Sequence, residues 1–196
     1  MIIPIPAFKD NYIWMFFDTA SKNAWVVDPG DANPVLETLQ KYGFELAGIL
    51  VTHHHHDHTG GVAELRQRWS KCPVFGADLK NGDEITCGSV RLKIIKIPGH
   101  TLDHIAFYNN DILFCGDTLF SAGCGKVFEG TPEQMYHSLM QLRALPEEIK
   151  MYCGHEYTRA NLNFAHQVEP NNAHIVDKMQ KVTCYWLKIS QRYLLL

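Results

Sequence analysis

The run His53-His54-His55-His56-Asp57-His58 constrains this chain more than any other feature of its sequence. It follows a continuous apolar segment, residues 47–51, which is typical of a buried strand. After Thr59 come two glycines, Gly60 and Gly61, which let the backbone bend closely around whatever the run holds. The sequence therefore predicts a loop at a strand end that gathers imidazoles and a carboxylate.

The composition of this run indicates metal binding. Alternate side chains of an extended segment point the same way, so we expect His53, His55 and Asp57 to face one side. His58 follows where the chain turns. Imidazole and carboxylate ligands together suit zinc, iron or manganese, and packing alone explains such a run poorly. Its internal position excludes an expression tag.

Three later motifs repeat the pattern of a polar side chain placed directly after an apolar run. They are Pro98-Gly99-His100-Thr101, Cys115-Gly116-Asp117-Thr118 and Cys153-Gly154-His155-Glu156. Each motif alone would be read as a structural turn, but together with residues 53–58 they favour one shared site. A carboxylate such as Asp117 has two oxygens that can bridge two cations, as a paired-metal site requires.

The remaining pattern predicts a layered α/β protein. Strands are expected over residues 2–5, 12–17, 24–27, 47–51, 90–97, 105–108, 112–115 and 149–153. Helices are expected over residues 33–42 and 59–68 and from a capping box at Thr131. Apolar residues at spacings of four and three predict a further amphipathic helix from Ala173 to at least Ile189.

Composition narrows the class of protein. The 196 residues suit one main domain, and a formal net charge of −3 gives no general attraction for nucleic acid. The N-terminal segment is broken by Pro4 and Pro6 and lacks a basic leader, so neither a signal peptide nor a membrane helix is expected. The cytoplasm is therefore the expected compartment. Six cysteines without a C-x-x-C pair argue against a zinc ribbon or a thioredoxin-type site.

The motifs T-H-H-H-H-D-H, P-G-H-T, G-D-T and G-H-E resemble the successive metal motifs of the metallo-β-lactamase superfamily. Residues 116–120, 122–126 and 154–158 more narrowly resemble glyoxalase II, the hydroxyacylglutathione hydrolases. This resemblance extends to about Pro170. It implies an αββα sandwich with the site at its edge and a short C-terminal helical segment. It further implies a catalytic domain over residues 1–157 and a truncated helical region over residues 158–196.

The resemblance also assigns roles. It implies two divalent metal ions, expected to be zinc with iron or manganese as alternatives. One ion would be held by His53, His55 and His100, the second by Asp57, His58 and His155, with Asp117 as the bridge. Lys126 and Tyr157 would bind the glutathione part of the substrate, although they could also be a solvated lysine and an ordinary half-buried aromatic. His54, His56 and His104 are then expected in outer or packing positions.

The implied reaction is hydrolysis of S-D-lactoylglutathione, or a related glutathione thioester, to glutathione and a 2-hydroxy acid. Two cations sharing a water would supply hydroxide near neutral pH, with Asp57 and Asp117 as the catalytic carboxylates. Such an enzyme takes a small-molecule partner and is expected as a monomer or a weak homo-oligomer.

Other functions remain open on the sequence. A mono-iron sulfur dioxygenase shares the scaffold, and the metal motifs alone do not exclude a lactonase or a β-lactamase. The chain departs from glyoxalase II after Pro170, where relatives continue into a longer helical domain with further basic residues. A metal-binding protein that is catalytically impaired is therefore a further alternative.

Overall fold

The first five strands form one mixed sheet in the computed structural model, which describes the backbone of residues 1–193 and the side chains of residues 1–183. The strands lie in chain order: β1 (Ile2–Ala7), β2 (Asn11–Asp18), β3 (Asn23–Val27), β4 (Glu45–Leu50) and β5 (Val74–Phe75). Along β2 the side chains alternate between the two faces, as the period of a strand requires. Ile13 and Met15 enter one hydrophobic cluster, whereas Trp14 and Phe16 face another.

The second sheet has the order β12-β9-β8-β7-β6 and packs face to face with the first. Its strands are β6 (Glu84–Cys87), β7 (Val90–Lys96), β8 (Ile105–Tyr108), β9 (Ile112–Gly116) and β12 (Lys150–Cys153). Phe16 of the first sheet stacks on Phe114 of the second with ring centroids 5.7 Å apart. This apolar layer between the sheets is the central part of the core.

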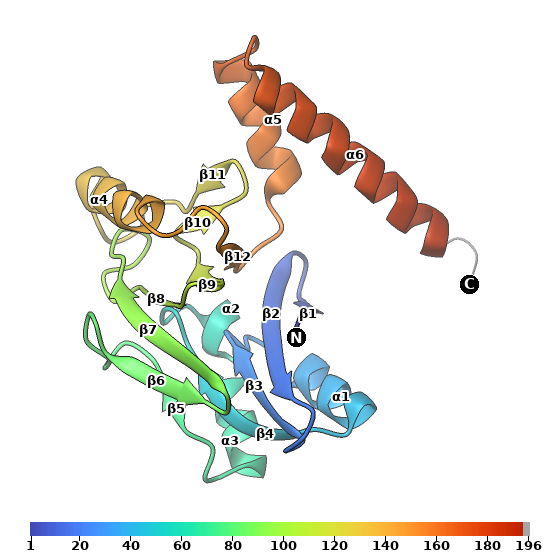
Figure 1. The fold of residues 1–196 in the computed structure, drawn as a ribbon, viewed down its shortest axis with the longest axis vertical. Helices are drawn as coiled ribbons and strands as arrows, with labels where there is room; N and C mark the ends of the chain where they lie inside the picture. Colours follow the sequence, from blue (N-terminus) through green and yellow to red (C-terminus); the bar gives the residue numbers. More distant parts are fainter. Residues whose placement is uncertain (194–196) are drawn as a thin grey trace.

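Helices cover the outer face of each sheet, so the layers run αββα as expected (Figure 1). Val35 of α1 (Ala32–Tyr42) and Leu65 of α3 (Val62–Arg68) are buried in the same cluster as Ile13. On the other side, Leu142 of α4 (Pro132–Arg143) packs with Leu113 of β9. The capping box at Thr131 that predicted the start of α4 is present.

Local details differ from the sequence prediction where turns and short strands decide them. The helix expected over residues 59–68 is two helices, α2 (His56–Thr59) and α3, because the chain turns at Gly60-Gly61. Helix α1 begins at Ala32, one residue before the predicted start, because Asp31 caps it and accepts from the Asn33 amide. The short strands β5, β6, β10 (Leu119–Phe120) and β11 (Gly123–Cys124) were not predicted, since so few residues show no clear period.

Two helices, α5 (Thr158–Val168) and α6 (Ala173–Tyr193), stand side by side at the edge of the layers (Figure 1). The helix predicted from Ala173 to at least Ile189 is confirmed. The side chains from residue 184 onward, and residues 194–196 altogether, lie outside the described part of the chain. The domain boundary after residue 157 stays a prediction, although α5 does begin at Thr158. No helix of the described residues is both long and apolar enough to cross a membrane.

Candidate metal centre

The seven residues singled out as metal ligands meet at one edge of the two sheets. They extend from the loops and the short helix that follow β4, β7, β9 and β12. The ligand atoms of His53, His55 and His100 lie within 4.8 Å of one another, and those of Asp57, His58 and His155 form a second such group. These two groups together contain six of the seven residues. Two further groups in the described part of the chain overlap them, Asp28 with His53 and His58, and Glu129 with His54 and His55.

Asp117 lies between the two groups. Its Oδ2 is 3.5 Å from His100 Nε2 in the first group and 3.2 Å from His155 Nε2 in the second. Its Oδ1 is 3.5 Å from His58 Nε2. One buried carboxylate thus contacts both groups, which is the geometry that a bridging ligand needs.

The simple alternation expected for the histidine run ends where α2 begins. His53 and His55 remain on one side, but Asp57 sits in the first turn of α2 and joins the second group instead. His54 and His56 are exposed rather than packed. His104 is in a packing position as expected, because it is fully buried and stacks on His53 with ring centroids 4.6 Å apart.

The donor set fits divalent metal ions on two observations. His58 Nε2 and Asp117 Oδ1 are buried and have no hydrogen-bond partner among the described residues, a costly arrangement unless a ligand satisfies them. In the first group, His53 Nε2 and His100 Nε2 each lie 3.1 Å from His55 Nδ1. Three imidazoles whose nitrogens converge, next to carboxylate oxygens, form the nitrogen and oxygen site that such ions prefer.

Two aspartates that the sequence analysis overlooked orient ligands of the second group. Asp28 is buried and accepts from His58 Nδ1 at 3.1 Å, while Asp10 accepts from His155 Nδ1 at 2.9 Å. Each contact fixes the imidazole ring and leaves its Nε2 directed at the site, as outer partners of metal-binding histidines do. The sequences around them, Asp10-Asn11 and Asp28-Pro29-Gly30, are typical of turns and carry no further signal of this role.

Further outer contacts hold Asp57 and the first group. Asn11 donates to Asp57 Oδ2 at 2.9 Å. Thr52 Oγ1 donates to Asp28 and lies 3.0 Å from His53 Nδ1, so it accepts from that nitrogen and leaves His53 Nε2 free for the site. These contacts preorganise the donor atoms before any ligand arrives.

Charges in the site shift the histidine pKa values in opposite directions. Burial lowers the pKa of His58, but the neighbouring carboxylates of Asp117 and Asp28 outweigh it and raise the pKa to about 10. The pKa of His155 also rises to about 10, since Asp117 and Asp57 outweigh burial. Burial and neighbouring histidines instead hold the pKa of His53 far below its usual value. Without a bound ion, the imidazoles of His58 and His155 would be protonated at neutral pH.

We expect metal uptake by the second group to release protons. A cation needs the Nε2 lone pairs of His58 and His155, whose pKa values of about 10 mean that both rings are protonated at pH 7. Metal affinity should therefore rise as the pH increases toward 10. Calorimetric zinc titrations at pH 7 in buffers of different ionisation enthalpy should show a heat that depends on the buffer. A heat independent of the buffer would contradict protonated rings.

A cavity of about 460 Å³ opens onto the two groups. Both predicted substrate-binding residues line it, together with Asp57, Asp117 and Phe128. The Tyr157 ring stacks on His155 at 4.8 Å, and burial raises the pKa of its hydroxyl to about 12, so the hydroxyl stays a donor. Exposed Lys126 has its Nζ 4.7 Å from the centroid of the Phe128 ring.

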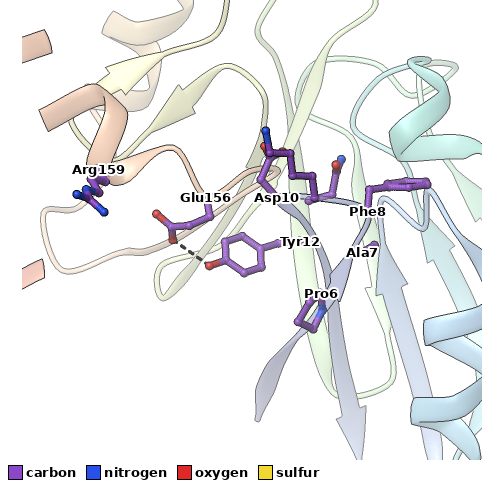
Figure 2. Close-up of a pocket in the computed structure, with 9 residues that line it drawn as sticks. Pro6, Ala7, Phe8, Asp10, Tyr12, Glu156 and Arg159 are labelled. Atoms are coloured by element: carbon purple, nitrogen blue, oxygen red, sulfur yellow. Dashed lines mark hydrogen bonds between the residues drawn. The ribbon is translucent and has the colours of Figure 1, made fainter. Parts of the chain in front are cut away.

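A second cavity of about 580 Å³ lies between the β1–β2 turn and the start of α5 (Figure 2). Tyr12 donates from its hydroxyl to Glu156 Oε2 at 2.9 Å across this cavity. The Tyr12 amide donates to Gly154 O and the Glu156 amide to Asp10 O, at 2.8 and 2.9 Å. The β1–β2 turn and the start of β2 therefore bind the residues directly before and directly after His155.

Comparisons with known proteins agree with this geometry. Residues 14–75 and 73–155 match the Metallo-beta-lactamase superfamily. The chain is 50% identical to a hydroxyacylglutathione hydrolase of Idiomarina loihiensis over 188 residues, covering 91% of this chain and 74% of that protein. It is 51% identical to one of Pseudomonas fluorescens, covering 92% and 75%. The solved B3 metallo-β-lactamase BLEG-1 has the same fold, with a TM-score of 0.74 at 24% identity over 80% of this chain and 92% of that one.

Proposed function

Because this chain belongs to the metallo-β-lactamase superfamily and, within it, to the hydroxyacylglutathione hydrolases, we propose that it hydrolyses S-D-lactoylglutathione or a closely related glutathione thioester. The products are glutathione and a 2-hydroxy acid. One observation supports this most directly: the two groups of donors and both predicted glutathione contacts open onto the same cavity. Residues 1–157 form the catalytic domain in this proposal, and a helical region follows from residue 158.

The proposed cofactor is a pair of divalent ions, with zinc favoured by the imidazole-rich donor set. His53, His55 and His100 would hold one ion, and Asp57, His58 and His155 the other, while Asp117 would contact both. Ions held there would supply hydroxide near neutral pH, by lowering the pKa of water, and would polarise a thioester carbonyl.

The side chains of the chain itself orient the reaction. Asp57 is held by Asn11 and is 42% exposed, so one carboxylate oxygen can accept a hydrogen bond from the attacking water. The water oxygen forms the new C–O bond, the C–S bond breaks, and the glutathione sulfur leaves with the electron pair and takes up a proton. Tyr157 and Lys126 hold the tripeptide, the lysine as an ammonium facing a carboxylate.

A thioesterase assay tests this proposal. Purified protein, loaded with zinc and analysed for metal content, should hydrolyse S-D-lactoylglutathione equally well with and without oxygen. Turnover should disappear after chelation and return when zinc is added back. Oxygen consumption with a persulfide substrate and no thioester hydrolysis would instead favour the sulfur dioxygenase alternative, whose chemistry needs oxygen.

We expect Lys126→Ala to raise KM more than it lowers kcat. The ammonium lies away from the reacting carbonyl, so it should stabilise the bound substrate and the transition state by similar amounts. Steady-state kinetics on lactoylglutathione would measure both constants, with Lys150→Ala, an exposed lysine at the start of β12, as the matched control. An unchanged KM would identify Lys126 as an ordinary surface lysine.

A further inference from the structure

Glu129 lies in the loop between β11 and α4, three residues after Lys126 and next to Phe128. We propose that Glu129 is a positioning residue that clamps this loop and so sets the glutathione-binding wall of the cavity. The inference rests on the proposed function, because it concerns how Lys126 and Phe128 are presented to that substrate. Glu129 is not among the residues that line the cavity.

The two carboxylate oxygens of Glu129 contact two different loops. Oε2 accepts from the Leu102 amide at 2.8 Å, and Oε1 lies 3.2 Å from His54 Nε2. The other ring nitrogen of His54 is 3.0 Å from Asp103 Oδ1. We call Glu129 with its two partners, Leu102 and His54, and with Asp103 behind His54, the Glu129 clamp. The clamp connects the loop between β11 and α4 to the loops that follow β4 and β7. Those two loops also carry the first group of histidines.

The backbone alone holds this loop with weaker contacts. The Phe128 and Glu129 amides both donate to His100 O, at 3.2 and 3.4 Å, and the Gly130 amide donates to Gly99 O at 3.1 Å. The two bonds to His100 O are at or beyond the long end of the usual range of N···O distances, and the bond to Gly99 O is near it. A bond to a charged carboxylate is shorter and about twice as strong as one between neutral groups. The bond from the Leu102 amide to Glu129 is therefore the strongest contact that holds the C-terminal half of this loop, while the bond from His100 Nδ1 to Lys126 O holds its start.

Loop position determines the shape of the cavity wall. Lys126 Nζ lies over the Phe128 ring, and that ring meets His55 and His100 edge-on with centroids 5.8 and 5.3 Å apart. If the loop moves, the cation and the aromatic surface move together. His100 Nδ1 also donates to Lys126 O at 2.8 Å, so the start of this loop keeps one anchor when the Glu129 carboxylate is removed. His55 belongs to the loop after β4, whose Thr59 donates from its hydroxyl to His55 O. Substrate binding should suffer more than metal binding.

The test compares Glu129→Ala, Glu129→Gln and the control Glu148→Ala, which removes an exposed carboxylate from the turn before β12. Glu129→Ala should keep its metal and raise KM on the order of ten-fold, the effect of losing one hydrogen bond to a charged group. Glu129→Gln keeps an acceptor for the Leu102 amide, so its KM should lie between the KM of Glu129→Ala and that of the unmodified protein. Glu148→Ala should leave both the metal content and KM unchanged.

Two further measurements separate a clamp from a general loss of structure. Amide hydrogen exchange over residues 126–130 should accelerate in Glu129→Ala and not in Glu148→Ala, whereas exchange in the β2 and β9 core should be unchanged. In a double-mutant cycle, Lys126→Ala should raise KM less in the Glu129→Ala background than alone, because the clamp acts through Lys126. Additive effects on KM, or unchanged loop exchange, would overturn the inference.

Failure of the proposed function would look different. If the unmodified zinc-loaded protein did not hydrolyse lactoylglutathione, the proposed function would be wrong. The KM comparisons among the variants could then not be made. The exchange comparison would still decide whether Glu129 orders residues 126–130. Faster exchange would support the clamp, and unchanged exchange would exclude it.

Discussion

Replacing Asp117 by alanine is expected to remove nearly all activity and to weaken metal binding by both groups of donors. Asp117 is buried, and its oxygens lie 3.2 to 3.5 Å from the donor nitrogens of His58, His100 and His155. The loss should exceed the roughly 100-fold that removal of an outer partner of a metal ligand costs. Metal analysis and thioester turnover on the same preparation would measure it.

A matched control for Asp117→Ala is His56→Ala, which removes an exposed histidine of the 53–58 run. It should keep its metal content and nearly all its rate. If Asp117→Ala retained two metal ions and the full rate, the bridging assignment would be wrong. If both variants lost metal equally, metal loss would not be specific to Asp117, and the result would not support a bridging role for it.

Gly154→Ala is expected to reduce metal affinity by at least about 10- to 100-fold, the range for disturbed outer contacts, while leaving the fold intact. A Cβ at this position would overlap Asp117 Oδ1 and lie 2.7 Å from His58 Cε1. Neither neighbour can give way, since both belong to the packed site and His58 is fixed by Asp28. The added methyl would therefore displace ligand atoms of the second group.

Gly76→Ala provides the comparison, because a Cβ there would meet Val51 at an ordinary contact distance of 3.7 Å. Circular dichroism should be the same for both variants, and zinc titration should separate them. Equal zinc affinity in Gly154→Ala and Gly76→Ala would mean that the site relaxes around the methyl, against the tight packing seen between Gly154, Asp117 and His58.

Much of this architecture was accessible from local sequence patterns. The apolar run before His53 and the capping box at Thr131 each report on a few neighbouring residues, whose backbone preferences and burial decide a strand or a helix. The same local logic identified which side chains would gather, because each candidate follows a strand and strand ends lie along one edge of a layered fold. The resemblance to a known family supplied the αββα arrangement.

What only the tertiary structure decided is how those side chains are arranged. The sorting of six donors into two groups, with Asp117 between them, depends on α2 turning Asp57 away from His53 and His55. Asp10 reaches His155 across 145 positions of sequence, and the hydroxyl of Tyr12 reaches Glu156 across 144. Such contacts arise from the packing of two sheets. A local sequence pattern cannot show which residues meet when they are that far apart in the chain. An aspartate in a turn therefore looks the same in the sequence whether it caps the turn or orients a histidine.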